Sequence, residues 1–480
     1  MPAVMTPSIV MPGDPGWDDA RQAWNLAVDQ HPAAVALPRS ADDVAGVIGF
    51  ARSRGLRVAA QGTGHNARPL GSLEDTVLVK TTRMRRVTID PDARIARVEA
   101  GAVWREVVDA AAGHGLATLA GSSPDVGVVG YTIGGGISWL GRAYGLAANN
   151  VEAIELVTAD GRLVRADACT EPDLFWALRG GGGSFGVVTA IELRLFPITQ
   201  VYAGQLWWPA DAAAQVLQAW RQLTEGDLPE EFTSAARLAN FPQIPSIPEH
   251  LRGRSFAVVF ASHLGSPAQA DALLAPLRAL RPVTDTIATI PVTALGSLHM
   301  DPEQPVRSVT KGLLVASLPA EATETFARAA GPEADTPPVW AELLRLGGEL
   351  RRARPASGAL SALDADYQLT AGSPASSPLA GPAAERSVAA VLTAMRPWAA
   401  RQMYLNNADT SRDPASFWTP EAYHRLRRIK AAIDPDDLIR SNHPVPPHRD
   451  TENGYRHDTR PQNPSAPATT VGRDDRHANV

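Results

Sequence analysis

The segment from residue 121 to residue 136 constrains the fold of this chain more than any other part of it. Six of its sixteen residues are glycine, and apolar residues stand between them. Glycine lacks a side chain, so another backbone or a ligand can approach this segment closely. Backbone amides in such a loop can bind a phosphate without any basic side chain. The segment therefore indicates an anion site made of backbone, with a ligand-free stack of glycine-rich turns as the alternative.

A second glycine loop satisfies the spacing G-x-G-x-x-G at Gly181, Gly183 and Gly186. In a dinucleotide-binding fold a strand precedes this pattern and a helix follows it, because the pyrophosphate lies at the helix N-terminus. Here the order is reversed, since residues 173–179 have a helical pattern and residues 187–196 alternate as a strand does. The context excludes a nicotinamide-binding Rossmann fold and leaves close backbone packing as the meaning of the loop.

The stretch QGTGHN places His65 in a third glycine turn. A histidine there can be a base, a metal ligand, an attachment point for a cofactor or an ordinary turn residue. Metal binding is disfavoured, because no second histidine, cysteine or carboxylate stands near it at a ligand spacing. The residues alone leave the other three roles open.

Apolar periodicity and capping residues predict the elements around these loops. Residues 33–60 are predicted as strand, helix and strand, with Ser40 capping the helix and Gly55 ending it. From about residue 200, helical patterns alternate with isolated strands, which indicates one sheet backed by helices. The helices predicted in this part are 211–225, 268–280 and 384–400, and the strands are 254–264, 311–318 and 364–371.

Length and composition exclude several classes of function. A chain of 480 residues is too long for one hydrophobic core. Its net charge of −6 gives no electrostatic reason to expect nucleic acid. Cys169 is the only cysteine, so no internal disulfide is possible, and no signal peptide or membrane span is recognised. We expect a cytoplasmic protein without nucleic-acid or membrane partners.

Seven stretches, in this order, resemble the FAD-linked oxidases of the berberine bridge enzyme-like group, within the vanillyl-alcohol oxidase and p-cresol methylhydroxylase superfamily. The resemblance covers roughly residues 20–447. The stretches are GLRVAAQGTGHN, VEAGAVWREV, GSSPDVGVVGYTIGGGISWLGRAYGL, DLFWALRGGGGSFGVVT, AELLRLGGEL, YLNN and RLRRIKAAIDPDDLI.

The resemblance implies an α+β fold with two parts. A two-subdomain FAD-binding domain of the p-cresol methylhydroxylase type would span residues 1–200. An antiparallel-sheet substrate domain backed by helices would span 201–400, and residues 401–447 would return to the FAD-binding domain. The polar composition of residues 448–480 predicts a disordered tail.

The resemblance also implies that FAD is the cofactor and that its pyrophosphate is held by glycine-rich backbone. His65 matches the position through which members of the group attach FAD covalently. Asn406 and Asn442 match positions near the isoalloxazine ring. The other matching cofactor positions are Gly62, Thr63, Gly64, Asn66, Gly121, Ser122, Ser123, Gly127, Gly134, Gly135, Gly136, Ser138, Gly186, Val187 and Val188.

Three departures or matches bear on how the flavin would behave. Ser123 stands where many relatives have a cysteine that forms a second covalent link, and serine is too weak a nucleophile for that bond. His65 is therefore expected to be the single tether. Val126 matches a gatekeeper of oxygen access at which valine accompanies oxidase behaviour. Tyr131 stands where the family often has a histidine near the flavin pyrimidine ring.

Flavin oxidases of this type remove a hydride from a C–H bond next to oxygen or nitrogen while a base takes a proton, and dioxygen then yields hydrogen peroxide. The expected substrate is a sugar, an alcohol or a secondary metabolite. The candidate bases are Tyr404 and Tyr367, and each could equally be a packed core tyrosine. Glu342 is a third titratable candidate, for which Arg345, three residues on, suggests a structural ion pair instead.

Two other functions fit the same resemblance. One is a flavin dehydrogenase that passes electrons to a quinone or another acceptor, which Val126 disfavours. The other is a flavin- or ligand-binding protein without turnover, in which the scaffold is kept and the base is lost.

Overall fold

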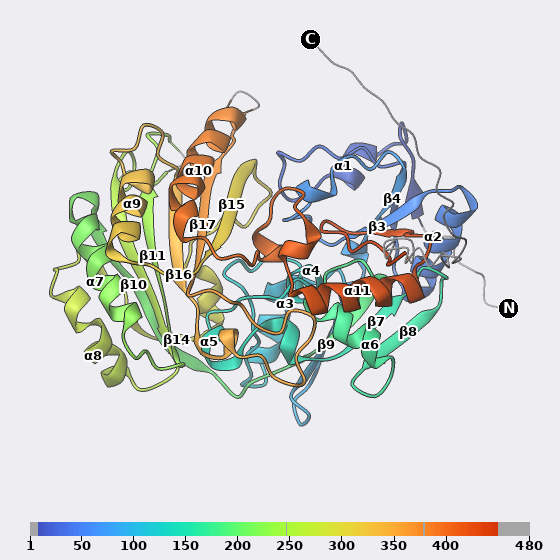
Figure 1. The fold of residues 1–480 in the computed structure, drawn as a ribbon, viewed down its shortest axis with the longest axis horizontal. Coiled ribbons are helices and arrows are strands. Elements are labelled where there is room, and N and C mark those ends of the chain that lie inside the picture. Colours follow the sequence, from blue (N-terminus) through green and yellow to red (C-terminus); the bar gives the residue numbers. More distant parts are fainter. Residues whose placement is uncertain (1–7, 246, 378–379, 450–480) are drawn as a thin grey trace, which may run out of the picture. The chain divides into compact units, whose positions relative to one another are not determined.

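The computed structural model describes residues 8–245, 247–377 and 380–449, whose strands form three sheets (Figure 1). The first sheet has the order β1-β2-β4-β3-β18; β1 is antiparallel to β2, and the other pairs are parallel. Its strands are β1 (Ser8–Val10), β2 (Ala34–Leu37), β3 (Arg57–Gln61), β4 (Thr76–Lys80) and β18 (Ile439–Arg440), and the helices α1 (Trp17–Arg21) and α2 (Ala41–Ser53) lie between them in sequence.

Helix α2 has the capping residues that its sequence predicts. Ser40 Oγ accepts a hydrogen bond from the Asp43 amide at 3.1 Å. The chain leaves the helix at Gly55 with φ of 64°, which glycine adopts without strain. One face of the helix is buried, at Val44, Val47, Ile48 and Ala51. The predicted strand, helix and strand over residues 33–60 are confirmed.

The second sheet is antiparallel, with the order β5-β6-β9-β7-β8. Its strands are β5 (Val87–Asp90), β6 (Ile95–Glu99), β7 (Val151–Val157), β8 (Leu163–Asp167) and β9 (Val187–Arg194). The helices within this stretch of chain are α3 (Trp104–Ala112), α4 (Val128–Ile133), α5 (Gly141–Tyr144) and α6 (Pro172–Leu178).

The two long glycine segments differ in how well they were predicted. Helix α6 precedes the loop at Gly181–Gly186 and β9 follows it, so the exclusion of a Rossmann context is confirmed. The segment 121–136 is not a stack of turns, because residues 128–133 form α4. Thr132 Oγ1 donates to the Val128 carbonyl oxygen at 2.8 Å within this helix.

The third sheet is antiparallel and has the order β13-β10-β12-β11-β16-β17-β15, with β14 paired to β10. Its strands are β10 (Gln200–Pro209), β11 (Phe232–Asn240), β12 (Ser255–His263), β13 (Thr284–Asp285), β14 (Ala288–Pro291), β15 (Ser308–Val315), β16 (Trp340–Arg345) and β17 (Tyr367–Pro374). Helices α7 (Ala213–Glu225), α8 (Pro267–Arg278), α9 (Ala320–Ala330) and α10 (Gly381–Met395) accompany it (Figure 1).

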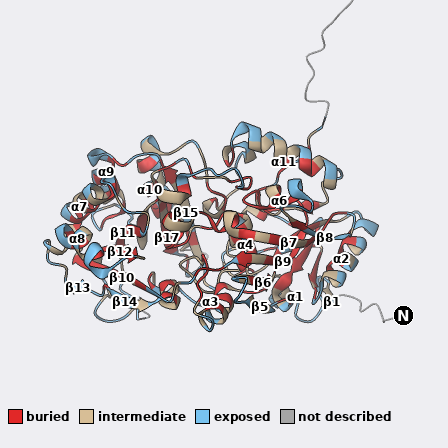
Figure 2. Ribbon diagram, turned by 90° about the horizontal axis from the view of Figure 1, so that it is seen from below, coloured by how far each residue is buried: buried red, intermediate tan, exposed pale blue. Residues whose placement is uncertain are grey.

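Alternate side chains of this sheet point to opposite faces. The face under the helices forms a core that contains Trp208, Trp220 and Phe326. The opposite face packs, through Trp207 and other apolar side chains, against Tyr131 of the glycine segment 121–136 and against Trp139 and Leu140, which follow that segment. Figure 2 shows the strands buried and the outward sides of the helices exposed. The predicted sheet backed by helices, and with it the α+β fold, is confirmed.

Sequence patterns missed β10, β11, β16 and α9. Eight of the nine residues of β11 are buried, and both faces of β16 are covered, so neither strand shows the alternation of polar and apolar residues that marks a half-exposed strand. The alanine-rich and leucine-rich composition of these segments also gives no strong strand preference.

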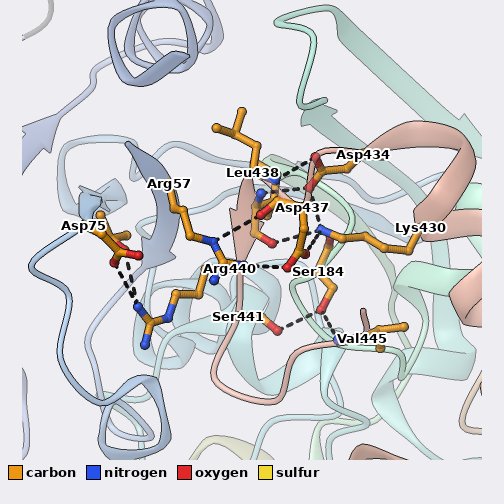
Figure 3. A network of polar contacts seen from close by, with 12 residues as sticks. Arg57, Asp75, Ser184, Lys430, Asp434, Asp437, Leu438, Arg440, Ser441 and Val445 are labelled. Carbon is orange, nitrogen blue, oxygen red and sulfur yellow. Dashed lines mark hydrogen bonds and ion pairs between the residues drawn. The ribbon is translucent and has the colours of Figure 1, made fainter. Parts of the chain in front are cut away.

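The return segment ends in α11 (Pro420–Ile433) and β18, and a buried lysine fixes both (Figure 3). Lys430 is fully buried, and its Nζ donates to the Ser184 and Ile439 carbonyl oxygens at 2.9 Å each. It also lies 2.5 Å from Asp434 Oδ2. The carboxylate of Asp434 accepts the amides of Leu438 and Ile439 at 2.8 Å. The network therefore joins α11, the loop after Gly183 and the strand that pairs with β3.

The predicted domain limits fall where the structure changes. Residue 200 begins β10 of the third sheet, and residue 400 lies between α10 and the return segment. Residues up to His448 form one compact unit, so these limits stay a prediction about domains. Within the described residues, no helix combines the length and the hydropathy that a membrane span requires. Of the predicted tail, residues 450–480 lie outside the described residues.

Replacing Asp434 with alanine should lower the free energy of unfolding by about 3 kcal/mol, because the buried Lys430 loses its nearer carboxylate and keeps only Asp437, at 3.2 Å, while the amides of Leu438 and Ile439 lose their acceptor. Chemical denaturation monitored by circular dichroism measures the change. Asp436→Asn is the matched control: Asp436 is exposed and 4.0 Å from Arg52, so its loss should cost less than about 1 kcal/mol. Equal effects of the two substitutions would contradict this account of the network.

Candidate active site

Three glycine loops lie in this region, and they are numbered in chain order: the first is residues 62–66, the second residues 121–136 and the third residues 181–186. The first and second loops lie side by side. The first, residues 62–66, follows β3, and a Cβ placed on Gly127 of the second would lie 3.6 Å from Thr63 Oγ1. Gly64 adopts φ of 88°, and a Cβ placed on it would lie 2.7 Å from Gln61 Nε2 and 3.0 Å from the Ala23 Cβ, too close for a side chain. The third loop joins them where the Gly182 amide donates to the Ile133 carbonyl oxygen at 3.1 Å.

Backbone amides at the junction of these loops are free to bind an anion. Among the described residues no partner is found for the amides of Thr63, Gly64, His65, Ser122 and Ser123. Unpaired backbone N–H groups that cluster in a loop form an anion-binding nest. The side chain of Gln61 at the end of β3 is buried and has neither its oxygen nor its nitrogen paired. These groups fit the phosphates of a dinucleotide such as FAD, with Gly62 leaving room for close approach.

His65 lies in a cage of three side chains drawn from both loops and from the N-terminal segment. Its ring stacks on Trp24 with a centroid distance of 4.1 Å and an interplanar angle of 19°. Its Nδ1 is 2.8 Å from Thr63 Oγ1, and its Nε2 is 3.6 Å from Asp125 Oδ2. Trp24 Nε1 donates to the same Asp125 oxygen at 2.5 Å. Both ring nitrogens therefore face a defined polar group, which an ordinary turn histidine does not require.

Asp125 is the carboxylate that spacing arguments did not find. It is 60 positions from His65 in sequence, and only the fold brings the two together. Burial alone would raise the pKa of Asp125, but the contact with His65 and the hydrogen bond from Trp24 outweigh it and lower that pKa. The carboxylate is thus ionised next to the imidazole.

The two serines of the second loop are held by an aspartate from the third-sheet region. Ser123 Oγ donates to Asp301 Oδ2 at 2.5 Å, and Ser122 Oγ lies 3.4 Å from the same oxygen. Asp301 follows the short 3-10 turn Val292–Ser297. The position that holds a cysteine in many relatives is therefore occupied here by a hydroxyl with a fixed partner.

Val126 and Tyr131 both lie at the edge of the core beneath the second loop. Val126 packs against that core, and its carbonyl oxygen accepts the Trp104 amide at 3.0 Å. The Tyr131 hydroxyl donates to the Leu119 carbonyl oxygen at 3.1 Å. Burial raises the pKa of Tyr131 well above its usual range, so this phenol stays neutral.

The amides of the glycines at 134–136 are hydrogen-bonded within the chain, and binding of FAD by these glycines stays a prediction. The amides of Gly134 and Gly135 both donate to the Thr132 carbonyl oxygen, and the Gly136 amide donates to the Tyr404 hydroxyl at 2.9 Å. A Cβ on Gly134 would collide with the Asn406 side chain. The missing side chains therefore make room for the return segment.

The return segment covers the glycine segment through Asn406. Its Nδ2 donates to the Tyr131 carbonyl oxygen at 2.9 Å and lies 3.0 Å from the Tyr404 hydroxyl. Asn66 of the first loop donates to the Leu405 carbonyl oxygen at 3.3 Å. Asn442 lies at the other end of the segment, where its Oδ1 accepts the His443 amide at 3.1 Å.

The remaining predicted cofactor positions are structural in the contacts they make. A Cβ on Gly186 would lie 2.8 Å from the Val157 carbonyl oxygen, so this glycine allows β9 to approach β7. Val187 and Val188 begin β9 and are buried in two different cores. Ser138 Oγ accepts the Leu140 amide at 3.2 Å, close behind the glycine segment.

Tyr367 lies on the wrong face of the third sheet to be the base, and that prediction is wrong. Its ring packs against Trp220 of α7, and its hydroxyl is 2.9 Å from Thr224 Oγ1. Both partners belong to the helix-covered core. Tyr367 is therefore a packed core tyrosine, which was the alternative to its being a base.

Tyr404 lies in the site but is poorly suited to accept a proton near neutral pH. Burial raises its pKa well above its usual range, although the hydrogen bonds from Gly136 and Asn406 oppose that shift. The phenol oxygen accepts both of these N–H groups. The contacts make Tyr404 an anchor between the return segment and the glycine segment.

A buried charge cluster lies on the sheet face that looks toward the glycine segment. Glu342 Oε2 accepts Arg237 Nε at 3.0 Å and lies 3.1 Å from His299 Nε2. Burial would raise the pKa of Glu342, but the charges of His299 and Arg237 lower it to about 2. The expected pairing of Glu342 with Arg345 is wrong, because residues three apart on a strand point to opposite faces, and Arg345 lies 3.4 Å from Asp366.

His299 links this cluster to the glycine segment. Its ring lies 5.2 Å from that of Trp139 and 4.7 Å from that of Phe260, measured between centroids. A cavity of about 320 Å³ is lined by Gly121, Ser138, residues 292–297 and part of α3, and His299 is not among its lining residues. Neither Arg237 nor His299 belongs to a sequence pattern, so sequence analysis could not have found them.

Comparisons with known proteins agree with this architecture. A family model described as "FAD binding domain" matches residues 32–167, and one described as "Berberine and berberine like" matches residues 403–446. The (R)-6-hydroxynicotine oxidase of Paenarthrobacter nicotinovorans is 28% identical over 92% of this chain and 96% of its own. The glucooligosaccharide oxidase of Sarocladium strictum is 33% identical over 44% of each chain.

Solved structures give the same result. The crystal structure of 6-hydroxy-D-nicotine oxidase from Arthrobacter nicotinovorans has a TM-score of 0.76 at 26% identity and covers 90% of this chain and 96% of its own. Berberine bridge enzyme from Eschscholzia californica has a TM-score of 0.78 at 21% identity, over 92% and 97% of the two chains, and shares the fold.

The fold, the free loop amides and the matched domains define a FAD-linked oxidoreductase. Within that class, the resemblance to the berberine bridge enzyme-like group is confirmed, since its FAD-binding domain and its berberine-like segment are both present. Its FAD-binding part is of the p-cresol methylhydroxylase type, as expected.

Glu342→Gln should lower the free energy of unfolding by about 3 kcal/mol at pH 7. This is the free energy that corresponds to lowering the pKa of the carboxylate from 4.5 to about 2. A lowered pKa stabilises the fold above the unfolded-state value, and this is lost as pH falls from 4.5 to about 2. The difference between wild type and variant should therefore shrink over that range. Thermal unfolding at several pH values measures it.

Glu225→Gln is the control for this measurement. Glu225 forms a half-exposed ion pair with Arg221 on α7, so its removal should cost less than about 0.5 kcal/mol. A Glu342→Gln variant as stable as the wild type at pH 7 would contradict the role given to the cluster.

Proposed function

We propose that this protein is an oxidase that carries FAD on His65 and oxidises a C–H bond next to oxygen or nitrogen in a small molecule, with dioxygen as the acceptor. The observation that carries the proposal is the position of His65. It lies at the junction of two glycine loops whose free amides fit phosphate, and both of its ring nitrogens face polar partners. The other proposed features build on that placement.

FAD, when bound, supplies the hydride acceptor that no amino-acid side chain provides. The chain's own residues bind and enclose it. The amides of the first and second loops bind its phosphates, and Tyr404 and Asn406 hold the return segment closed over the glycine segment. Burial of this region excludes water from the reacting atoms.

The tether is single. Ser123 Oγ donates to Asp301, so the hydroxyl at the position of the second link is neutral and already engaged. A carboxylate is far too weak a base to ionise an aliphatic hydroxyl, so the contact with Asp301 leaves Ser123 a weak nucleophile. The exposed Cys169 lies after β8, outside the matching stretches.

Dioxygen as acceptor is supported by Val126 and by the oxidases among the relatives. The competing function is a dehydrogenase with another acceptor. In a protein of the same fold, a single-residue variant of berberine bridge enzyme is described as a reticuline dehydrogenase, so one residue can decide the acceptor. The third candidate, a binding protein without turnover, is disfavoured by the buried titratable cluster at Glu342.

The substrate would lie between the glycine segment and the polar face of the third sheet. The residues there that can orient a polar substrate are Arg237, Glu342 and His299, not Tyr367. We assign His299 as the proton acceptor, since an imidazole nitrogen can take up a proton and Glu342, 3.1 Å from Nε2, can orient the ring. Nicotine derivatives and oligosaccharides are substrates named for relatives, and both have a C–H next to nitrogen or oxygen.

Acid precipitation tests the attachment to His65. The washed pellet of the wild-type protein should stay yellow, because a covalent bond survives denaturation. The pellet of a His65→Ala variant should be colourless, with its FAD in the supernatant. Absorbance of both fractions gives the result. A colourless wild-type pellet, or a yellow pellet from the variant, would contradict the proposal.

A further inference from the structure

We propose that Asp125 is a positioning residue for the attachment of FAD: it keeps a proton on Nε2 of His65, so that Nδ1 is the nitrogen that bonds to the flavin methyl carbon. The inference rests on the proposed covalent link at His65. It assigns a role to a carboxylate that neither the family matches nor the sequence pattern singles out.

The geometry orients the imidazole from three sides. Asp125 Oδ2 faces Nε2 at 3.6 Å, which is an ion-pair distance and longer than a hydrogen bond. Thr63 Oγ1 faces Nδ1 at 2.8 Å, and Trp24 covers one face of the ring. With the proton on Nε2, Nδ1 carries the lone pair and accepts the hydrogen bond from the Thr63 hydroxyl, which Thr63 must release when Nδ1 bonds to the flavin.

Asp125 is itself fixed in place. Trp24 Nε1 donates to its Oδ2 at 2.5 Å, so one indole both stacks on the imidazole and holds the carboxylate that faces it. The other oxygen, Oδ1, is buried, and no hydrogen-bond partner for it is found in the part of the chain that the structure describes. A carboxylate whose second oxygen is kept unpaired in a half-buried cage is poorly explained as a structural ion pair.

Formation of the bond between His65 and FAD needs a carboxylate next to the imidazole, because the imidazole becomes positively charged. Bond formation joins Nδ1 of His65 to the methyl carbon on the benzenoid ring of FAD. The methyl carbon loses one hydrogen as a proton. Because Nδ1 gains a bond, the imidazole is positively charged until Nε2 gives up its proton. Two electrons pass to FAD, and dioxygen takes them up with two protons as hydrogen peroxide.

Asp125 lowers the barrier to this step by favouring the charged imidazole and by accepting the Nε2 proton. A carboxylate that fixes the tautomer and balances the charge of a reacting histidine acts in the same way in hydrolytic triads. Asparagine has a similar shape but cannot do either. Replacing Asp125 with asparagine therefore removes the negative charge from the cage around His65 and keeps the shape of that cage.

The test compares purified Asp125→Asn, Asp125→Glu and wild-type holoprotein by acid precipitation. The fraction of flavin that remains in the pellet is measured together with total bound FAD and the melting temperature. Asp125→Asn should bind FAD but retain at least about tenfold less of it covalently, the lower range of a general-base effect. Asp125→Glu, which keeps the charge, should restore most of the covalent fraction.

Asp366→Asn is the matched control, since Asp366 is a partly buried, arginine-paired aspartate just before β17 and should keep a wild-type covalent fraction. Proteolysis of the wild type and identification of the flavin–histidine isomer should place the bond at Nδ1. A bond at Nε2, or an Asp125→Asn pellet as yellow as the wild type, would overturn the inference while leaving attachment at His65 intact. A yellow His65→Ala pellet would overturn both.

Discussion

The buried contact between Lys430 and Asp434 is the interaction on which the arrangement of the site depends. It fastens α11 and β18 to the first sheet and to the loop after Gly183 (Figure 3). A lysine without exposure to water needs all of its partners, so the segment has one well-defined way to close. That closure places Tyr404 and Asn406 against the glycine segment, where the glycines have no side chains to obstruct them.

Local signals explain what the sequence predicted of the fold. The cap at Ser40, the turn at Gly55 and the order of α6 and β9 around the Gly181 loop each depend on a few neighbouring residues, and each prediction is confirmed. The strands β11 and β16 were missed because they are covered on both faces, and burial on both faces removes the alternation that identifies a strand. Helix α4 was missed because glycine-rich composition favours turns.

The site was predictable only as far as its motifs extend. The glycine loops brought His65 and Ser123 to attention, but the partners of these residues, Asp125 and Asp301, are 60 and 178 positions away along the chain. The pairing assumed for Glu342 applied helical spacing to a strand, and Tyr367 was assigned without knowledge of which sheet face it occupies. Contacts between distant segments are set by tertiary packing, which no local pattern records.

We propose that these residues together form an oxidase. Its use of dioxygen as the electron acceptor can be tested by a single measurement. Protein reduced anaerobically, with dithionite or any substrate that bleaches the flavin, is mixed with oxygenated buffer in a stopped-flow instrument. Return of the oxidised flavin absorbance within milliseconds to seconds, with hydrogen peroxide formed in equal amount, is the predicted result. Reoxidation that takes minutes would contradict the account and identify a dehydrogenase.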